Sequence, residues 1–165
     1  MERETEHRGE ERTVRISTGE IELEGNLGLV EDAEGVVLFA HGSGSGRSSP
    51  RNLYVARVLR QAGLSTLLID LLTAQEEAVD LRTRQLRFDI GLLAERLVGA
   101  TDWLRNNRNT QTSRIGYFGA STGAGAALVA AAERPDQVGA VVSRGGRSDA
   151  PVTRLVVGSA AAVMR

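Results

Sequence analysis

The sequence of 165 residues contains no cysteine and no lysine, and it has only two histidines and three prolines. Without cysteine, the chain can form no disulfide framework, no thiolate nucleophile and no zinc–cysteine site. Without lysine, it cannot form the Gly-Lys-Ser/Thr ending of a phosphate-binding loop, although residues 42–49 are rich in glycine and serine. The basic charge therefore comes from arginine alone, and the 20 arginines are scattered along the chain.

Long apolar runs and an excess of charge of one sign are also missing. No window approaches the roughly 18 uninterrupted apolar residues of a transmembrane helix, and the formal net charge is −1. Residues 1–12 are rich in Glu and Arg without an apolar centre, which predicts a solvated tail and not a signal peptide. We therefore expect one cytoplasmic domain over residues 13–165, with no nucleic-acid or membrane partner. Nothing in the sequence indicates an oligomeric state.

Short apolar runs between polar or glycine-rich turns predict the strands. Residues 13–30 alternate with a period near two around Thr18 and Gly19, which predicts an antiparallel hairpin with one buried face. The continuous apolar run at residues 36–40 is typical of a strand buried on both faces of a mainly parallel sheet. Further runs predict strands at residues 66–69, 115–118 and 138–142.

Helical spacing and boundary residues predict the segments between these strands. A helix is predicted at residues 50–63, with Ser49 at the N-cap, a proline as the first residue and a glycine as the stop. Residues 86–107 predict a long amphipathic helix, and residues 122–133 an alanine-rich one. Residues 73–84 are polar and predict a loop or lid over the strand ends. The alternation of strands and helices predicts an α/β fold with right-handed crossovers.

The last residues, 150–165, fit this pattern poorly. Residues 155–157 could form one more strand, but residues 160–164 end the chain on an apolar run without a helix stop. Such an ending would leave core surface uncovered. We therefore expect an α/β domain with a mainly parallel central sheet flanked by helices that is missing its last one or two strand–helix units.

The pattern Gly119-x-Ser121-x-Gly123 lies between a predicted strand and a predicted helix. This context is that of a nucleophile elbow, a strained turn that lifts a serine hydroxyl out of the sheet and needs small neighbours. The turn also aims the backbone N–H of Thr122, at the helix N-terminus, toward a developing oxyanion. We predict Ser121 as a nucleophile. The alternative is a plain glycine-rich turn with an idle serine.

A second motif, His41-Gly42-Ser43-Gly44-Ser45-Gly46, follows the buried strand at residues 36–40. A loop at this place can bring a second backbone N–H, that of Ser43, to the same oxyanion. The alternative is a plain flexible loop. For His41 we expect a structural role in which the ring holds backbone by a hydrogen bond, and general-base catalysis is the alternative.

The two motifs together resemble the dienelactone hydrolase-like branch of the α/β-hydrolase superfamily. The likeness covers about residues 13–147. It implies a serine hydrolase with Ser121 as nucleophile and the N–H groups of Thr122 and Ser43 as oxyanion donors, acting on a small-molecule carboxylic ester, lactone or similar acyl bond. It implies neither a metal nor an organic cofactor. Name-giving members have cysteine where this chain has Ser121, so dienelactone itself is not the expected substrate. The resemblance rests on residues 38–46 and 116–123 and, less specifically, on residues 70–73 and 144–147.

The catalytic triad is incomplete in this sequence. The superfamily supplies the triad in the order Ser, Asp or Glu, His, and no histidine follows Ser121. Asp149 is a conceivable triad acid, with a surface carboxylate as the alternative. Because an unassisted serine hydroxyl is a poor nucleophile, we expect this chain to be inactive or impaired. Arg144 and Arg147 are predicted to lie at the substrate site, where they could attract a carboxylate, and simple surface solvation is the alternative.

Two other classes stay open. Gly119, Gly123 and Gly125 match the glycine spacing of a short-chain dehydrogenase cofactor loop, and Arg144 could accept the 2′-phosphate of NADP. Against this, that loop normally follows the first strand, and here three or more predicted strands precede it. The third class is a non-catalytic module with an α/β-hydrolase-like fold, which the missing histidine favours.

Overall fold

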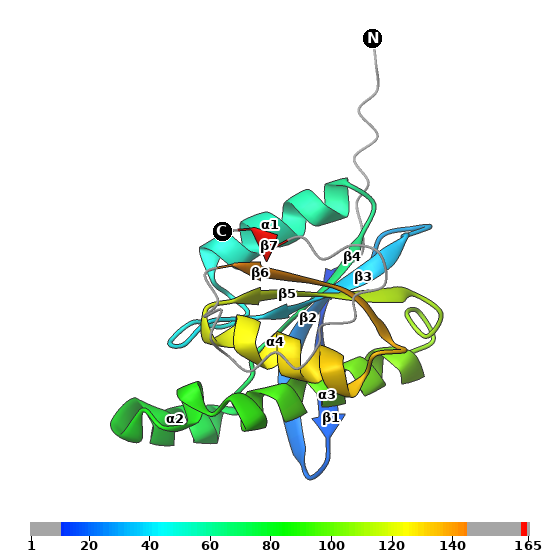
Figure 1. The fold of residues 1–165 in the computed structure, drawn as a ribbon. Helices are drawn as coiled ribbons and strands as arrows, with labels where there is room; N and C mark the ends of the chain where they lie inside the picture. Colours follow the sequence, from blue (N-terminus) through cyan, green and yellow to red (C-terminus); the bar gives the residue numbers. More distant parts are fainter. Residues whose placement is uncertain (1–10, 145–162, 165) are drawn as a thin grey trace.

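The computed structural model describes residues 11–144 and 163–164, which form a seven-stranded sheet with helices on both faces (Figure 1). The strand order is β1-β2-β4-β3-β5-β6-β7. No helix in the described part of the chain is long and apolar enough to cross a membrane. In chain order the elements are β1 (Glu11–Thr18), β2 (Ile21–Gly28), β3 (Gly35–Ala40), α1 (Pro50–Gln61), β4 (Ser65–Ile69), α2 (Ala74–Thr83), the 3-10 helix η1 (Leu86–Phe88), α3 (Ile90–Asn106), β5 (Arg114–Ala120), α4 (Thr122–Glu133), β6 (Val138–Arg144) and β7 (Val163–Met164).

The sheet is antiparallel at one edge and parallel elsewhere, as the apolar patterns predict. β1 and β2 form the predicted hairpin, and β2 pairs antiparallel with β4. From β4 onward every neighbouring pair is parallel. Ala40 at the end of β3 is in register with Gly119 near the end of β5. Because parallel strands end at the same edge, the two loops that follow β3 and β5 meet there.

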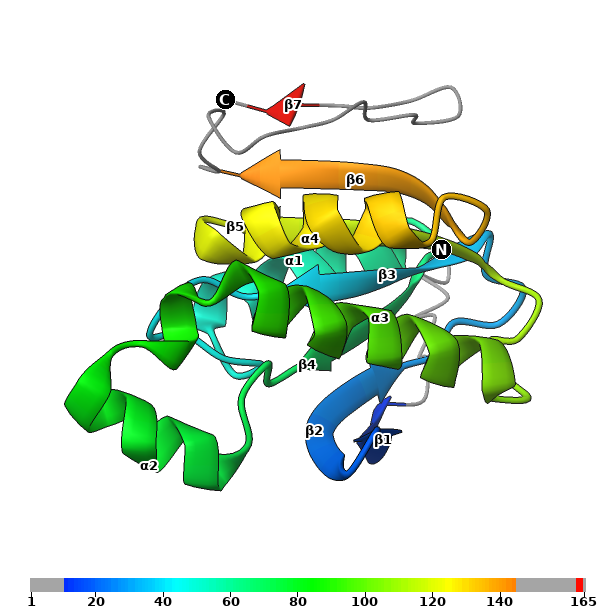
Figure 2. The ribbon, with the colours of Figure 1, turned by 60° about the horizontal axis from the view of Figure 1, so that its bottom comes forward.

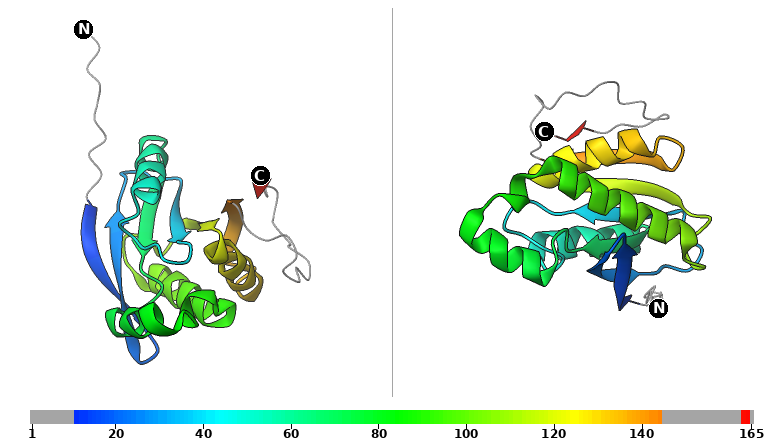
Figure 3. Two further views of the ribbon diagram at one scale, coloured as in Figure 1. Left: turned by 90° about the vertical axis from the view of Figure 1, so that its left-hand side faces the viewer. Right: turned by 90° about the horizontal axis from the view of Figure 1, so that it is seen from below.

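Helices cover the two faces of the sheet unequally. α1 lies on one face, and α3 and α4 lie side by side on the other (Figures 2 and 3). The larger apolar cluster includes Leu97 of α3, Ala126 of α4 and Leu38 of β3, all fully buried. A smaller cluster includes Ala56 of α1 and Phe39 of β3. The sheet is therefore buried on both faces along β3, β4 and β5, which explains their continuous apolar runs.

The boundaries of α1 follow the predicted signals with one exception. Gly63 has a φ of +92°, and its N–H donates to the carbonyl of Arg60 at 3.0 Å while the N–H of Leu64 donates to that of Leu59 at 3.0 Å. These two bonds are those of a Schellman ending, which favours glycine at this position. Ser49 is at the N-cap, but its side chain makes no capping hydrogen bond.

The prediction of a loop at residues 73–84 is wrong, because α2 occupies this segment. The hydroxyl of Thr73 accepts from the N–H of Glu76 at 3.1 Å, and the Glu76 carboxylate accepts from the N–H of Thr73 at 3.4 Å. This capping box starts the helix. α2 buries only Asp80, so it has no apolar stripe that periodicity could reveal.

The prediction of one continuous helix from residue 86 is also wrong in its first turn. Leu86–Phe88 form the 3-10 helix η1, and α3 begins after Asp89. The carboxylate of Asp89 accepts from the N–H of Leu92 at 3.0 Å and so caps α3. Leu86 therefore lies outside α3, although its spacing places it in the same apolar series as the residues of that helix.

Few of the predictions for the two ends of the chain can be compared with the structure, which describes residues 11–144 and 163–164. β1 begins at Glu11, two residues before the predicted hairpin. The possible strand at residues 155–157 lies outside the described residues, as do Arg147 and Asp149. The apolar run at the end of the sequence contains a strand that periodicity did not predict, since Val163 and Met164 pair with Ser143 and Arg144 of β6.

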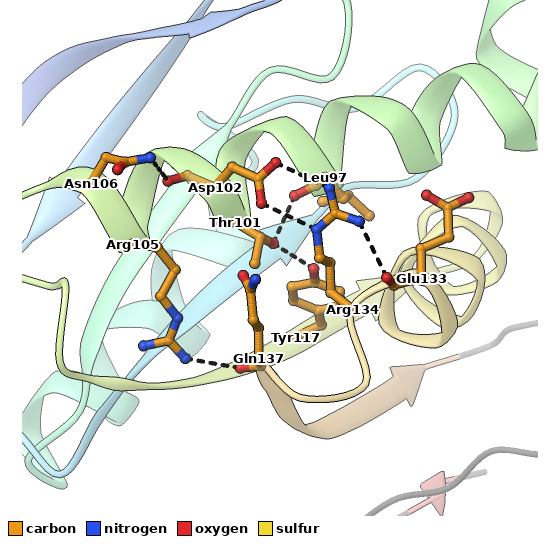
Figure 4. Close-up of polar contacts among 9 residues, drawn as sticks. All are labelled: Leu97, Thr101, Asp102, Arg105, Asn106, Tyr117, Glu133, Arg134 and Gln137. Atoms are coloured by element: carbon orange, nitrogen blue, oxygen red, sulfur yellow. Dashed lines mark hydrogen bonds and ion pairs between the residues drawn. The ribbon is translucent and has the colours of Figure 1, made fainter.

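A polar cluster joins β5 to α3 and extends from the buried Tyr117 and Thr101 to a partly exposed ion pair (Figure 4). The hydroxyls of Tyr117 and Thr101 share a short hydrogen bond, and Thr101 also donates to the carbonyl of Leu97 at 2.8 Å. Arg134 forms an ion pair with Asp102 at 3.2 Å. Burial raises the pKa of Tyr117 to about 12, and the hydrogen bond with Thr101 acts in the opposite direction.

Candidate active site

Ser121 occupies a strained turn between β5 and α4. Its φ is 52° and its ψ is −121°, a left-handed conformation that costs a residue other than glycine about 1–3 kcal/mol. Two backbone bonds hold it there: its N–H donates to the carbonyl of Arg144 at 2.9 Å, and its carbonyl accepts from the N–H of Ala124 at 3.0 Å. The residue is exposed. The turn therefore presents the serine at the carboxyl edge of the sheet.

The glycines on either side of Ser121 are there because the chain crowds against itself. A Cβ at Gly119 would lie 2.6 Å from Cα of Ala124. A Cβ at Gly123 would overlap the carbonyl oxygens of Ala40 and His41, where β3 ends. The physical reason predicted for small neighbours is thus present at both positions.

The loop at residues 41–46 lies against this turn, as the strand order predicts. A Cβ at Gly42 would lie 3.4 Å from Cβ of Ser121, which shows how closely the loop approaches it. The hydroxyl oxygens of Ser43 and Thr122 are 2.7 Å apart and share a hydrogen bond. The structure therefore brings Ser121, Thr122 and Ser43 together from segments that are far apart in the sequence.

His41 holds the start of this loop. The N–H of Leu71 donates to Nε2 of His41 at 3.0 Å, and Nδ1 lies 2.9 Å from the carbonyl oxygen of Gly42. A neutral ring with its hydrogen on Nδ1 satisfies both contacts. Both ring nitrogens are thus engaged by backbone, which confirms the structural role predicted for His41. Neither nitrogen is left to accept a proton from Ser121.

A cavity of about 620 Å³ lies beside the same loop. Ser43 lines it, whereas Ser121 is not among its lining residues. Its opposite wall comes from α2, η1 and α3, so the segment predicted to cover the strand ends does so as a helix. Besides the loop, the lining residues are Ser49, Pro50, Asp70, Leu72, Glu77, Asp80, Leu81, Arg87 and Leu93.

An ion pair between Asp80 and Arg87 forms part of this wall, and the sequence did not predict it. Nε of Arg87 lies 2.7 Å from Oδ2 of Asp80, and its backbone N–H donates to Oδ1 at 3.1 Å. Burial alone raises the pKa of Asp80, but the hydrogen bonds and the charge of Arg87 outweigh it, so this pKa lies below its ordinary value. The pair joins α2 to η1. No local motif marks it, because neither residue belongs to a recognisable pattern.

The two arginines predicted at the substrate site have different outcomes. Arg144 ends β6 opposite Ala120, and its carbonyl holds the N–H of Ser121. It therefore lies at the turn, and its contact there is made by main chain. Arg147 lies outside the described residues. Among the described residues, no group of three or more His, Asp or Glu side chains is arranged to hold a metal ion.

Solved structures with this fold include several hydrolases. A dienelactone hydrolase from Anabaena variabilis is 70% identical, with a TM-score of 0.86 over 88% of this chain and 68% of that one. Est1E of Butyrivibrio proteoclasticus is 17% identical, with a TM-score of 0.64 over 79% of this chain and 49% of that one. The esterase Pf2001 of Pyrococcus furiosus is 20% identical, with a TM-score of 0.64 over 84% of this chain and 52% of that one. These last two show the fold alone.

Among curated proteins, the chain is similar to one from Mycobacterium tuberculosis, present in strains CDC 1551 and H37Rv. The two are 55% identical over 136 residues, which make up 82% of this chain and 30% of that protein. The mycobacterial protein carries the name of a phosphoribosyl transferase. This chain thus spans less than a third of that relative. No family model matches the sequence.

Proposed function

Because the chain belongs to the dienelactone hydrolase family of α/β-hydrolases, we propose that Ser121 is the nucleophile of a hydrolase acting on a carboxylic ester, lactone or similar acyl bond. The observation that carries this proposal is the conformation of Ser121, with a φ of 52° between β5 and α4. Strain of this kind is kept only where the surroundings impose it, and it clusters at functional sites.

The chemistry follows from the position of this turn. The hydroxyl oxygen of Ser121 attacks the acyl carbon, and the carbonyl oxygen becomes an oxyanion. The backbone N–H of Thr122, at the positive end of α4, and the backbone N–H of Ser43 stabilise that charge. Collapse of the intermediate expels the alcohol and leaves an ester on Ser121, which water then hydrolyses. The substrate reaches the turn from the cavity that Ser43 lines.

The proton of Ser121 must go to a general base. The one histidine in the described part of the chain, His41, has both nitrogens bonded to backbone. The base is therefore supplied from outside the described residues, and without it acylation of Ser121 is slow. Activated esters and fluorophosphonates react even with a modestly activated serine, which makes them the suitable probes.

The dehydrogenase alternative has little support in the geometry. The turn at Ser121 follows β5, the fifth strand of the described residues, and not a first strand. The name of the mycobacterial relative raises a second possibility. Since the fold of this chain is that of a hydrolase, we propose that transferase activity in such a protein belongs to the part of it that this chain does not match.

The test is covalent labelling of the full chain with a fluorophosphonate, followed by peptide mass spectrometry. We expect label on Ser121, no label after Ser121→Ala, and unchanged labelling after Ser48→Ala, at an exposed serine that does not line the cavity. Turnover of a p-nitrophenyl ester is measured on the same variants. Labelling that survives Ser121→Ala, or a wild-type chain that takes no label, contradicts the proposal and favours a non-catalytic module. Binding of NADPH would instead support the dehydrogenase.

A further inference from the structure

The paired hydroxyls of Ser43 and Thr122 hold one proton more than their mutual hydrogen bond uses. The two oxygens are 2.7 Å apart and either could be the donor. One O–H serves that bond, and the other is left to donate elsewhere. No described residue accepts a hydrogen bond from either hydroxyl besides its partner. A hydroxyl donor is therefore available beside the nucleophile turn.

The usual partner of a helical threonine is absent here for a structural reason. A threonine inside a helix donates to the carbonyl four residues earlier, as Thr101 does to Leu97 at 2.8 Å. Thr122 is the first residue of α4, so the residues before it belong to β5 and offer no such helical carbonyl. Its hydroxyl turns instead to Ser43.

The cavity distinguishes the two hydroxyls. Ser43 lines it, and Thr122 is not among its lining residues. The substrate side of the pair is thus Ser43, and Thr122 lies behind it at the helix N-terminus. With Thr122 as the donor to Oγ of Ser43, the hydrogen of Ser43 is free for an acceptor in the cavity. A hydroxyl that already accepts a hydrogen bond is polarised and becomes a better donor.

We propose that the hydroxyl of Ser43 is a third oxyanion donor, in addition to the two backbone N–H groups, and that Thr122 is a positioning residue that orients and polarises it. This inference rests on the proposed nucleophilic role of Ser121. As the acyl oxygen gains negative charge, it accepts the Ser43 hydrogen. When the intermediate collapses, the electron pair on the oxyanion re-forms the C=O bond and the alkoxide leaves with the electrons of the broken C–O bond. The hydrogen stays on Ser43, so Ser43 transfers no proton.

The experiment measures acylation of Ser121 by p-nitrophenyl acetate in the full chain, over a range of ester concentrations that separates the rate from apparent binding. Ser43→Ala keeps the backbone N–H and removes the hydroxyl, so we expect about a 100-fold slower acylation with little change in binding. Thr122→Val is expected to slow acylation about tenfold, the effect of one ordinary hydrogen bond. Thr122→Ser keeps the hydroxyl and restores the wild-type rate.

The double variant Ser43→Ala/Thr122→Val gives the decisive result. If Thr122 acts through Ser43, the double variant is no slower than Ser43→Ala alone, and the two effects are not additive. Ser48 is an exposed serine just after this loop and does not line the cavity, so Ser48→Ala is the matched control and keeps the wild-type rate. Melting temperatures of all variants identify any that fail to fold.

Two outcomes overturn the inference. If Ser43→Ala folds normally and acylates at the wild-type rate, or if the two substitutions add, the hydroxyl pair only holds the loop, and the proposed role of Ser121 is unaffected. If Ser121 of the wild-type chain takes no acyl group at all, the proposed function fails and this inference fails with it.

Discussion

Single residues at the turn show how far local sequence determines the site. The elbow at Ser121 was predictable because its cause is local: a strand ends, a helix begins, and the glycines between them leave room. The hydroxyl bond between Ser43 and Thr122 was not predictable, since it joins side chains 79 positions apart. It depends on strand order and on two side-chain rotamers, which no short pattern encodes.

The crowding at Gly123 gives a direct test at this scale. We expect Gly123→Ala to lower the free energy of unfolding by about 3 kcal/mol, the upper range for an overpacked site, because the added Cβ meets backbone carbonyls that cannot rotate away. We also expect it to abolish labelling of Ser121. Urea denaturation and the fluorophosphonate assay measure the two effects.

Gly125 of the same helix is the matched control. A Cβ there would lie 3.3 Å from Cδ1 of Ile90, a flexible side chain that can move away. Because alanine is favoured over glycine in helices by about 1 kcal/mol, Gly125→Ala should leave stability unchanged or raise it. Equal losses in the two variants would show that helix α4, and not its approach to β3, sets the cost.

At the scale of elements, the strands were predictable and α2 was not. The parallel strands β3, β4, β5 and β6 each show a continuous apolar run whose observed limits lie within about two residues of the prediction, whereas the short β7 was not predicted. α2 is stabilised by its capping box and by an ion pair. The guanidinium of Arg96 in α3 donates two hydrogen bonds to the carboxylate of Glu76, at 2.8 and 3.0 Å. Contacts of this kind leave no periodic trace in the sequence.

The ion pair between Asp80 and Arg87 makes the attachment of α2 sensitive to acid. The folded chain lowers the pKa of Asp80. The ionised Asp80 therefore stabilises the folded chain fully above the pKa of an unfolded aspartate, about 3.9. This stabilisation is lost as the pH falls through the lower pKa that Asp80 has in the folded chain. We expect Asp80→Asn to be less stable than wild type at pH 7 and the difference to shrink toward pH 3.

Urea midpoints at pH 7, 5 and 3 measure this dependence. Glu77→Gln is the control, since Glu77 lies on the same helix, is exposed and forms no ion pair among the described residues. A difference between Asp80→Asn and wild type that stays constant from pH 7 to pH 3 would contradict the assignment.

For the whole molecule, the polar cluster around Tyr117 couples stability to alkaline pH. Burial raises the pKa of Tyr117 to about 12, whereas an unfolded tyrosine has a pKa near 10. Folding therefore favours the neutral phenol. Its contribution is complete below about pH 10 and is lost as the pH rises toward 12, and it amounts to about 3 kcal/mol. Denaturant unfolding between pH 8 and 12 should show this loss in the wild type and a flatter curve in Tyr117→Phe.

The composition leaves few other groups that titrate in the pH range of this measurement. With no cysteine and no lysine, tyrosine is the only side chain in the sequence that ordinarily titrates between pH 9 and 12, and there are two tyrosines. Tyr54 is exposed, so Tyr54→Phe is the control and should keep the wild-type pH dependence. Loss of the dependence in Tyr54→Phe, and not in Tyr117→Phe, would contradict the assignment.

The backbone contacts of the turn have a consequence for when the serine can react. The N–H of Ser121 bonds to the end of β6, and Gly123 lies against the end of β3. Both partners come from strands far from the turn in sequence, so nascent or damaged chains lacking either strand would not hold the bend. The proposed reactivity of Ser121 therefore depends on both strands being in place, and we expect chains that lack either strand to take no fluorophosphonate label.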